Sequence, residues 1–309
     1  MNFFNLSSSN ASGKTLIIIK SSGQSSNRLI QNLHFEAFCR EHGLYCRNPT
    51  FADMAKFYVS PCNVETNHFI NFIKTNLLGK LFRHAMIVNK IFFPAWLISK
   101  LGLIKYVDFD RTKREKNVEK ILLDAFEKHD TVFVGGWNFR VPELVEKHRA
   151  SLVKQYSLKP DLYEDNAFYK RVIELKRLGN KLVGVHIRRG DYKKWHGGKY
   201  YFNDEVYEKY MNAFSQRLLR EGAKEPVFIL FSNEKVSFAE TSNLMVSKES
   251  WFIDHLIMSL CDYLIGPPST FTLWANYIGN NTLFHIQDAN GGTMEYTTSG
   301  SREKNLFHD

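Results

Sequence analysis

The chain has 309 residues, a length that favours two domains over one. Hydrophobic residues make up 44% of the sequence and charged residues 24%, the balance of a globular protein, which excludes wholesale disorder. With 41 basic and 32 acidic side chains the net charge is +9, which suits an anionic partner such as a nucleic acid, a membrane surface or a phosphorylated substrate.

The first elements predict an α/β domain. Residues 15–20 (TLIIIK) form a β-branched run bounded by turn residues, the pattern of a buried strand. A polar loop (SSGQSSN) follows, and residues 28–43 then carry apolar side chains at helical spacing and end on glycine. Because open α/β sheets bind ligands at the carboxyl ends of their strands, this loop is a candidate ligand site.

Residues 68–107 mix large apolar side chains with Lys, Arg and His and contain no acidic residue. The pattern favours short amphipathic helices, broken at Pro94 and Gly102, that face the core. The alternative is a surface in peripheral contact with an anionic membrane, or one that holds a lipid-linked acceptor. The sequence has no run of ~20 apolar residues and no signal-peptide pattern, so we expect a cytoplasmic protein with at most this peripheral membrane contact.

The middle of the chain predicts a strand, a helical segment and a domain junction. Residues 131–137 (TVFVGGW) form a strand that ends in a glycine turn, and residues 142–177 are charged and helical with an interruption at Pro160. We place the boundary there, which gives domains of residues 1–158 and 159–309.

From Lys181 onward, strands alternate with helices. The expected strands are residues 181–187, 226–232, 264–266 and 282–286, and the expected helices are residues 204–221, 251–263 and 269–279. Such alternation implies a parallel sheet with right-handed crossovers, so the expected fold class is α/β.

The strongest local signal is VGVHIRRGDY, residues 183–192, in which a buried strand delivers His186, Arg188, Arg189 and Asp191 at its carboxyl end. A guanidinium matches phosphate oxygens in a two-bond fork, which makes the arginines candidate phosphate ligands. Neighbouring residues of a strand point to opposite faces, so only one arginine can easily face a given ligand. An internal Arg–Asp ion pair explains the same residue types equally well.

Two further segments carry candidate polar groups. PPSTFTLW, residues 267–274, turns into a helix at Ser269 and Thr270, and a helix N-terminus can bind an anion. Ordinary N-capping by Ser269 is the simpler alternative. Asp254 lies among apolar neighbours in the helix of residues 251–263, where burial of an unpaired carboxylate is costly, so it needs a donor from an arginine or from a ligand.

These three segments, in this order, resemble the GT-B fucosyltransferases that use GDP-fucose. HIRRGDY is similar to the motif of the α-1,2-fucosyltransferases, glycosyltransferase family 11, and its H-x-R-R core is shared with the α-1,6- and O-fucosyltransferases. The Asp254 helix followed by STF resembles their second and third motifs, and SGQSSNRL resembles their N-terminal glycine loop. The stretch KKWHGGKYYF, residues 193–202, is unlike the α-1,2 enzymes.

The resemblance implies a GT-B architecture, with two Rossmann-like domains facing a cleft. Residues 1–158 would form the acceptor-side domain and residues 159–309 the domain that binds the GDP-sugar. The implied activity is that of an inverting fucosyltransferase, which moves fucose from GDP-fucose to a hydroxyl of a glycan acceptor in α-1,2 linkage.

The resemblance further implies a role for each residue of the donor site. Arg188 holds the β-phosphate of GDP, with Arg189 beside it, and Ser269, Thr270 and the backbone around Phe271 complete the phosphate site.

For the base of the nucleotide, the resemblance implies that His186 and Asp254 lie near the guanosine. Asp254 then accepts hydrogen bonds from the guanine N1 and its exocyclic amine, a pair of donors that adenine lacks. Asn27, which follows Gly23 in the N-terminal loop, approaches the diphosphate from the other domain.

A base must take the proton of the acceptor hydroxyl, and the candidates are Asp191 and His196. Two nearby arginines should lower the pKa of Asp191, so its expected role is to orient Arg188 or Arg189. The imidazole group of a histidine can accept a proton near neutral pH, and the glycines that flank His196 allow it to reach the cleft, so we expect it to be the base; a solvated loop histidine is the alternative. No D-x-D motif stands beside the predicted strands and no His/Cys cluster has metal spacing, so no metal or other cofactor is expected.

Other functions compete with this one. A basic nucleic-acid-binding α/β protein would explain the net charge and the basic residues from Arg111 to Lys116, but no RRM, zinc-finger or helix-turn-helix pattern supports it, and we expect no nucleic-acid partner. A phosphotransferase would need G-x-x-x-x-G-K-[ST], which is absent. A GT-B transferase that uses another GDP-sugar stays open.

Overall fold

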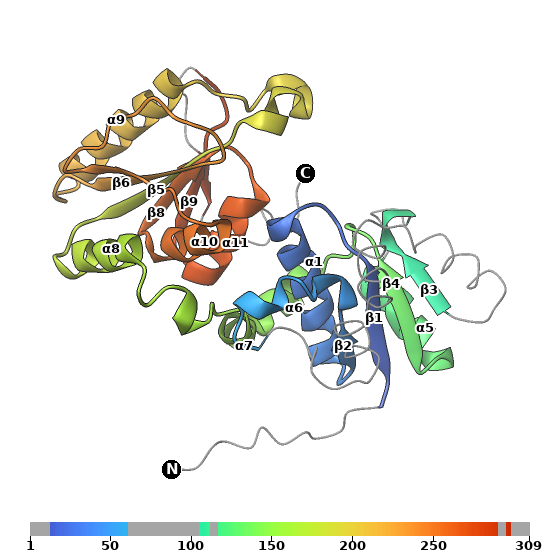
Figure 1. Cartoon of the computed structure of the whole chain (residues 1–309). Helices are drawn as coiled ribbons and strands as arrows, with labels where there is room; N and C mark the ends of the chain where they lie inside the picture. Colours follow the sequence, from blue (N-terminus) through green and yellow to red (C-terminus); the bar gives the residue numbers. More distant parts are fainter. Residues whose placement is uncertain (1–12, 61–104, 112–116, 290–294, 298–309) are drawn as a thin grey trace, which may run out of the picture. The chain divides into compact units, whose positions relative to one another are not determined.

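The structure, a computed structural model, describes residues 13–60, 105–111, 117–289 and 295–297. The chain divides into two compact units, Met1–Ser157 and Leu158–Asp309, and each has a sheet of its own (Figure 1). The division falls one residue before the boundary that the sequence suggests.

The first unit is built on a four-stranded parallel sheet with the strand order β2-β1-β4-β3. Its strands are β1 (Thr15–Lys20), β2 (Tyr45–Arg47), β3 (Lys105–Asp108) and β4 (Thr131–Gly135). Its helices are α1 (Ser25–Glu41), α5 (Val118–Lys128), α6 (Pro142–Lys147) and α7 (Arg149–Gln155), with 3-10 turns η1 (Pro49–Phe51), η2 (Ala55–Phe57) and η3 (Phe109–Arg111). The strand and helix expected at the N-terminus, and the strand expected at 131–137, are confirmed.

Aromatic rings fill the core of this unit. Phe35 of α1 stacks on Phe139, with ring centroids 4.4 Å apart, and Phe38 and Phe109 pack against the same ring at 5.7 and 4.8 Å. All four rings are buried, and such aromatic pairs add to the free energy gained from area burial. The packing holds α1 firmly against the loops that follow β3 and β4.

One expectation about this unit is wrong. The sequence predicts helices throughout 68–107, but Lys105–Asp108 is strand β3, which pairs in parallel with β4. Tyr106 and Val107 are buried there, and strand pairing of this kind depends on a partner that the local pattern does not reveal. The rest of the basic segment, residues 68–104, and the membrane contact expected of it lie outside the described residues.

The second unit holds a six-stranded sheet with the order β10-β9-β8-β5-β6-β7, parallel except for β10, which runs antiparallel to β9. The strands are β5 (Leu182–Ile187), β6 (Val227–Ser232), β7 (Leu244–Val246), β8 (Tyr263–Gly266), β9 (Thr282–His285) and β10 (Glu295–Thr297). The helices are α8 (Ala167–Arg177), α9 (Asp204–Arg220), α10 (Trp251–Leu260) and α11 (Thr270–Gly279), with 3-10 turns η4 (Pro160–Leu162), η5 (Gly190–Lys193) and η6 (Trp195–Gly198). Every element expected after Lys181 is present, whereas the three-residue strands β7 and β10 are not predicted.

Helices cover both faces of this sheet: α9 lies on one side, and α8, α10 and α11 lie on the other (Figure 1). All six residues of β5 are buried, as expected of a central parallel strand. Val183, Val185 and Ile187 belong to a core that includes Tyr207 and Phe214 of α9. The alternate residues of β5, including His186, therefore face the α10 and α11 side.

The two helices α10 and α11 lie in backbone contact. A Cβ added to Gly279, at the end of α11, would collide with the backbone of Ser259 in α10. Only glycine permits this approach, and α11 then ends at Asn280, whose φ of 56° lies in the left-handed region. In the described part of the chain, none of the helices combines the length and the apolar character that a bilayer crossing requires.

Candidate donor-binding site

The two strongest motifs meet at one edge of the second sheet. β5 and β8 are hydrogen-bonded neighbours, so the segment after Ile187 and the segment after Gly266 leave the sheet side by side. The Tyr192 hydroxyl donates to the carbonyl of Pro268 at 2.5 Å. The sequence expectation that the arginine motif and the PPSTF turn share one edge is therefore confirmed for these segments.

His186 lies at this edge with its ring stacked on Phe271, the centroids 5.2 Å apart. The side chain is buried, and burial, with a smaller effect of the Arg188 charge, lowers the pKa of His186 to about 3. The ring is therefore neutral, and within the described residues its Nδ1 has no hydrogen-bond partner. The backbone beside it is crowded: a Cβ on Gly266 would lie 2.8 Å from the His186 carbonyl oxygen, which explains the glycine.

Arg188 stands just beyond the end of β5 with its side chain partly exposed. Its guanidinium contacts Asp191 at 2.9 Å and lies 5.5 Å from the centre of the Tyr192 ring. The side chain of Asp191 is 64% exposed. A carboxylate has only two oxygens, so it can hold Arg188 in place while other N–H donors of the guanidinium stay available for a ligand. Of the two arginines that Asp191 was expected to orient, it contacts Arg188.

The side chain of Arg189 has different partners from that of Arg188. Its guanidinium pairs with Asp204 at the start of α9, and its backbone N–H donates to Asn233 at 3.3 Å. Burial acts to raise the pKa of Asp204, but the backbone N–H of Ser237 and the Arg189 guanidinium outweigh it and leave that pKa lowered. Arg189 therefore braces the loop against α9, with 13% of its side chain exposed.

The PPSTF turn becomes the first turn of α11. Ser269 is the N-cap, and its hydroxyl accepts from the backbone N–H of Phe271 at 3.2 Å, so the simple capping role that the sequence allowed is present. Thr270 is the first helical residue. The positive end of a ten-residue helix thus lies at the edge that carries Arg188, and the two together favour an anion.

Asp254 lies in the first turn of α10, where the Ser247 hydroxyl donates to its carboxylate at 2.5 Å. Burial raises the pKa of Asp254 to about 7, against the opposing effect of that hydrogen bond. The donor that the sequence demanded is thus a serine rather than an arginine.

The next residue, His255, was not predicted from the sequence. Its buried ring lies 3.9 Å from the Phe271 ring, which places the start of α10 against the start of α11. Burial, then the neighbouring His186, lowers the pKa of His255 to about 3. The Phe271 ring therefore contacts two neutral histidines, whereas the resemblance gave a role only to the backbone around Phe271.

His196 lies in η6 and is exposed. Its φ of 46° is left-handed, which is uncommon outside glycine, and its ring contacts Trp195 at 4.4 Å and Tyr200 at 6.2 Å. The side chain is thus held on the loop that follows Arg188, as a candidate base requires.

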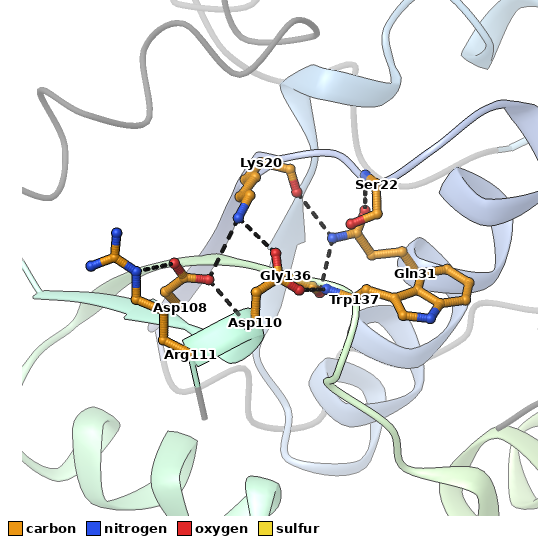
Figure 2. A network of polar contacts seen from close by, with 8 residues as sticks. All are labelled: Lys20, Ser22, Gln31, Asp108, Asp110, Arg111, Gly136 and Trp137. Atoms are coloured by element: carbon orange, nitrogen blue, oxygen red, sulfur yellow. Dashed lines mark hydrogen bonds and ion pairs between the residues drawn. The ribbon is translucent and has the colours of Figure 1, made fainter. Parts of the chain in front are cut away.

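The glycine loop of the first unit is also held in a fixed shape. Gly23 has a φ of 62°, and a Cβ there would collide with the side chain of Asn27 in the first turn of α1. The Gln31 amide accepts from the Ser22 N–H at 3.0 Å and donates to the carbonyls of Lys20 and Gly136 at 3.0 and 3.1 Å (Figure 2). These bonds fasten the loop to the end of β4, and Asn27's approach to the donor diphosphate stays a prediction.

Charged groups surround this loop. Lys20 contacts Asp110 at 2.6 Å and Asp108 at 3.8 Å, and Asp110 also accepts from the backbone N–H of Trp137 (Figure 2). The network ties together the carboxyl ends of β1, β3 and β4. Asp108 and Asp110 form a D-x-D sequence at the end of β3, so the expectation that no such motif stands beside a strand is wrong; both aspartates pair with Lys20. Within the described residues, no group of three His, Cys, Asp or Glu side chains is arranged to hold a metal ion.

The family model for glycosyl transferase family 11 matches residues 63–305, most of the chain. The chain belongs to glycosyl transferase family 11. The resemblance noted in the motifs is thereby confirmed. Mouse galactoside alpha-(1,2)-fucosyltransferase 2 is 27% identical over 153 residues, which are 44% of this chain and 42% of that protein, so the match spans less than half of the relative's length.

Solved structures share the fold. An Arabidopsis thaliana FUT1 mutant in complex with GDP has a TM-score of 0.51 and 10% identity, covering 92% of this chain and 74% of that one. Fucosyltransferase NodZ from Bradyrhizobium has a TM-score of 0.50 and 12% identity, covering 92% and 99%. The expected α/β fold of the GT-B type, with a Rossmann-like sheet in each unit, is confirmed.

Proposed function

We propose that this family 11 member is an inverting fucosyltransferase that moves fucose from GDP-fucose to a glycan hydroxyl, in α-1,2 linkage. The observation that carries the proposal is the junction of the Arg188 segment and the α11 N-terminus, joined by the Tyr192–Pro268 hydrogen bond. The name of the mouse relative supports the choice of sugar and linkage.

In this proposal the diphosphate of the donor lies against Arg188 and the first turn of α11. Both groups carry positive charge at any working pH, and they supply the charge stabilisation that a divalent metal gives in other transferases. We therefore propose that donor binding needs no metal and no further cofactor.

The guanine lies beside the stack formed by His186, Phe271 and His255. Asp254, on the same helix turn as His255, accepts from the guanine N1–H and the exocyclic amine. Two parallel donors of this kind match the two oxygens of one carboxylate, and adenine does not present them.

The reaction breaks the bond between fucose C1 and the β-phosphate oxygen, and the electron pair leaves with GDP. Arg188 and the α11 N-terminus face the charge that builds on the leaving group, which makes them the electrostatic catalysts. The acceptor oxygen attacks C1 from the opposite face, and its proton passes to the imidazole of His196. Attack from the opposite face inverts the anomeric configuration.

Thermal unfolding in the presence of nucleotides tests the donor. GDP at about a hundredfold excess over its dissociation constant should stabilise the chain by ~2.7 kcal/mol, which raises the Tm by several degrees, whereas ADP and UDP should not. A shift with a DNA duplex and none with GDP would refute the proposal. Turnover of GDP-fucose beside GDP-mannose on a glycan panel, with the product linkage read by NMR, then tests the sugar and the linkage.

A further inference from the structure

The segment after Arg188 carries a cluster of aromatic rings. In the aromatic loop, residues 192–201, the partly exposed Trp195 contacts the rings of Tyr192 at 4.6 Å, His196 at 4.4 Å and Tyr200 at 5.4 Å. Aromatic rings of this size are usually buried in a core, whereas here Trp195, Tyr200 and His196 all keep exposed surface. Sugar rings present C–H groups that pack on such faces.

Three lysines surround these rings. The ammonium group of Lys199 lies 5.0 Å from the centre of the Tyr200 ring, and that of Lys193 lies 5.4 Å from the Tyr201 ring. Together with Lys194 they are exposed, and no carboxylate of the described residues lies within ion-pair distance of any of them. The loop therefore offers positive charge that no carboxylate in the described part of the chain neutralises.

The backbone gives the loop a defined shape. His196, Gly197 and Gly198 follow one another with φ values of 46°, 67° and 84°. Glycine adopts a positive φ at little cost, whereas for His196 it is unfavourable in isolation and persists where the surroundings enforce it, typically at functional sites. A Cβ on Gly198 would lie 3.1 Å from the Lys193 carbonyl oxygen, so the turn is closed tightly on itself.

The root of the loop belongs to the candidate donor site. The Tyr192 ring lies 5.5 Å from the Arg188 guanidinium and 4.6 Å from the Trp195 ring, and its hydroxyl donates to the Pro268 carbonyl of the PPSTF turn. A molecule resting on Trp195 is thus one ring away from the group that we propose holds the donor phosphate. An acceptor sugar must occupy such a neighbouring position for transfer.

We propose that the aromatic loop is the acceptor-binding platform and that it takes a glycan with an anionic group, a carboxylate or a phosphate, beside the sugar that packs on Trp195. This inference rests on the proposed function, because it assigns the acceptor of that reaction. A neutral glycan would need the rings alone. Lys194 and Lys199, which have no ion-pair partner among the described residues, select the charged one, and the net charge of +9 strengthens the attraction at low salt.

Ligand-observed NMR titrations of the full chain with GDP bound test the platform without requiring turnover. Three matched probes are methyl β-galactoside, methyl β-galacturonoside and methyl β-galactoside 6-phosphate. The dissociation constant of at least one anionic probe should be about fivefold lower than that of the neutral one, the upper range for an exposed ion pair, and ~0.5 M salt should abolish the difference. The better of the two anionic probes identifies the charged group.

Variants separate the charge from the rings. In the Lys194→Gln/Lys199→Gln double variant the three probes should bind equally, whereas Trp195→Ala should weaken all three by about tenfold. Lys224→Gln serves as the control. It removes the charge of an exposed lysine that precedes the amino end of β6, whereas the aromatic loop follows the carboxyl end of β5, and the affinities of all three probes should stay unchanged.

Equal affinity for the three probes in the wild-type chain, or a preference that survives in the double lysine variant, would overturn the proposal. So would a single-stranded oligonucleotide that displaces the glycosides, since lysines and rings also suit nucleic acid. GDP affinity measured in the same samples stands apart: its absence would count against the proposed function, and its presence with equal probe affinities would remove only the platform.

Discussion

The pKa of Asp254, raised to about 7 by burial, makes GDP binding depend on pH in a way that can be calculated. Only the carboxylate offers guanine two acceptors, so binding selects the ionised form. About nine tenths of the group is ionised at pH 8 and about one tenth at pH 6. The dissociation constant of GDP should therefore rise about tenfold over that range.

Titration calorimetry of GDP at these pH values measures the effect. The phosphates of GDP also titrate in this range, so the Asp254→Asn variant serves as the matched control, because it keeps the ligand's contribution and removes that of the carboxyl. His186 and His255, with pKa values of about 3, stay neutral throughout and add nothing. At pH 8 the variant should bind GDP more weakly by about 1–3 kcal/mol, the range for an unpaired polar group.

Stability should move in the opposite direction from affinity. The pKa of Asp254 is higher in the folded chain than in the unfolded chain, so the folded state binds more protons and stability falls as the pH rises from about 4 to about 7. Asp254→Asn should therefore raise the Tm above pH 7 while lowering GDP affinity. A wild-type GDP affinity that is constant from pH 8 to pH 6, or an identical pH dependence in the variant, would refute the assignment of guanine to Asp254.

Three further substitutions test the rest of the site. Arg188→Ala should cost about 3–4 kcal/mol of transition-state stabilisation, and Arg188→Lys should not restore it. Arg189→Ala should lower the Tm and reduce kcat/KM less than Arg188→Ala does; equal losses of kcat/KM at both positions would contradict the separate roles. His196→Ala should lower kcat at least about tenfold with GDP affinity intact, and an unchanged kcat and pH–rate profile would exclude it as the base. Gly266→Ala should reduce the free energy of unfolding by about 1–3 kcal/mol, because the added methyl group meets the neighbouring strand, and unaltered denaturant unfolding would contradict this.

The elements that the sequence predicts are those whose cause is local. The buried run of β5 and the helical spacing of α9 each identify an element without reference to the rest of the chain. β3 is wrongly predicted because Lys105–Asp108 is a strand only by virtue of its pairing with β4. The candidate site divides in the same way: Arg188 and the α11 start follow from strand and helix ends.

The partners within the site are not local and were not predictable. Arg189 pairs with Asp204 because α9 begins close to the end of β5, and no spacing in the sequence predicts that pair. The contact between His255 and Phe271 likewise depends on how closely α10 and α11 pack. The sequence indicates which residue types lie at the carboxyl ends of the strands, whereas the packing of the helices decides which of these side chains contact one another.

The backbone contact of α10 and α11 at Gly279 fixes the separation of the two helices. Asp254, which we assign to the base, stands on one helix, and the positive end that we assign to the phosphates belongs to the other. Because the two helices are packed too closely to slide, the distance between Asp254 and the N-terminus of α11 is fixed. That distance must match the separation of the guanine and the phosphates in the nucleotide. Any side chain at Gly279 would push the two helices apart and change that distance. Such a substitution would disturb recognition of both the base and the phosphates, although Gly279 itself contacts neither.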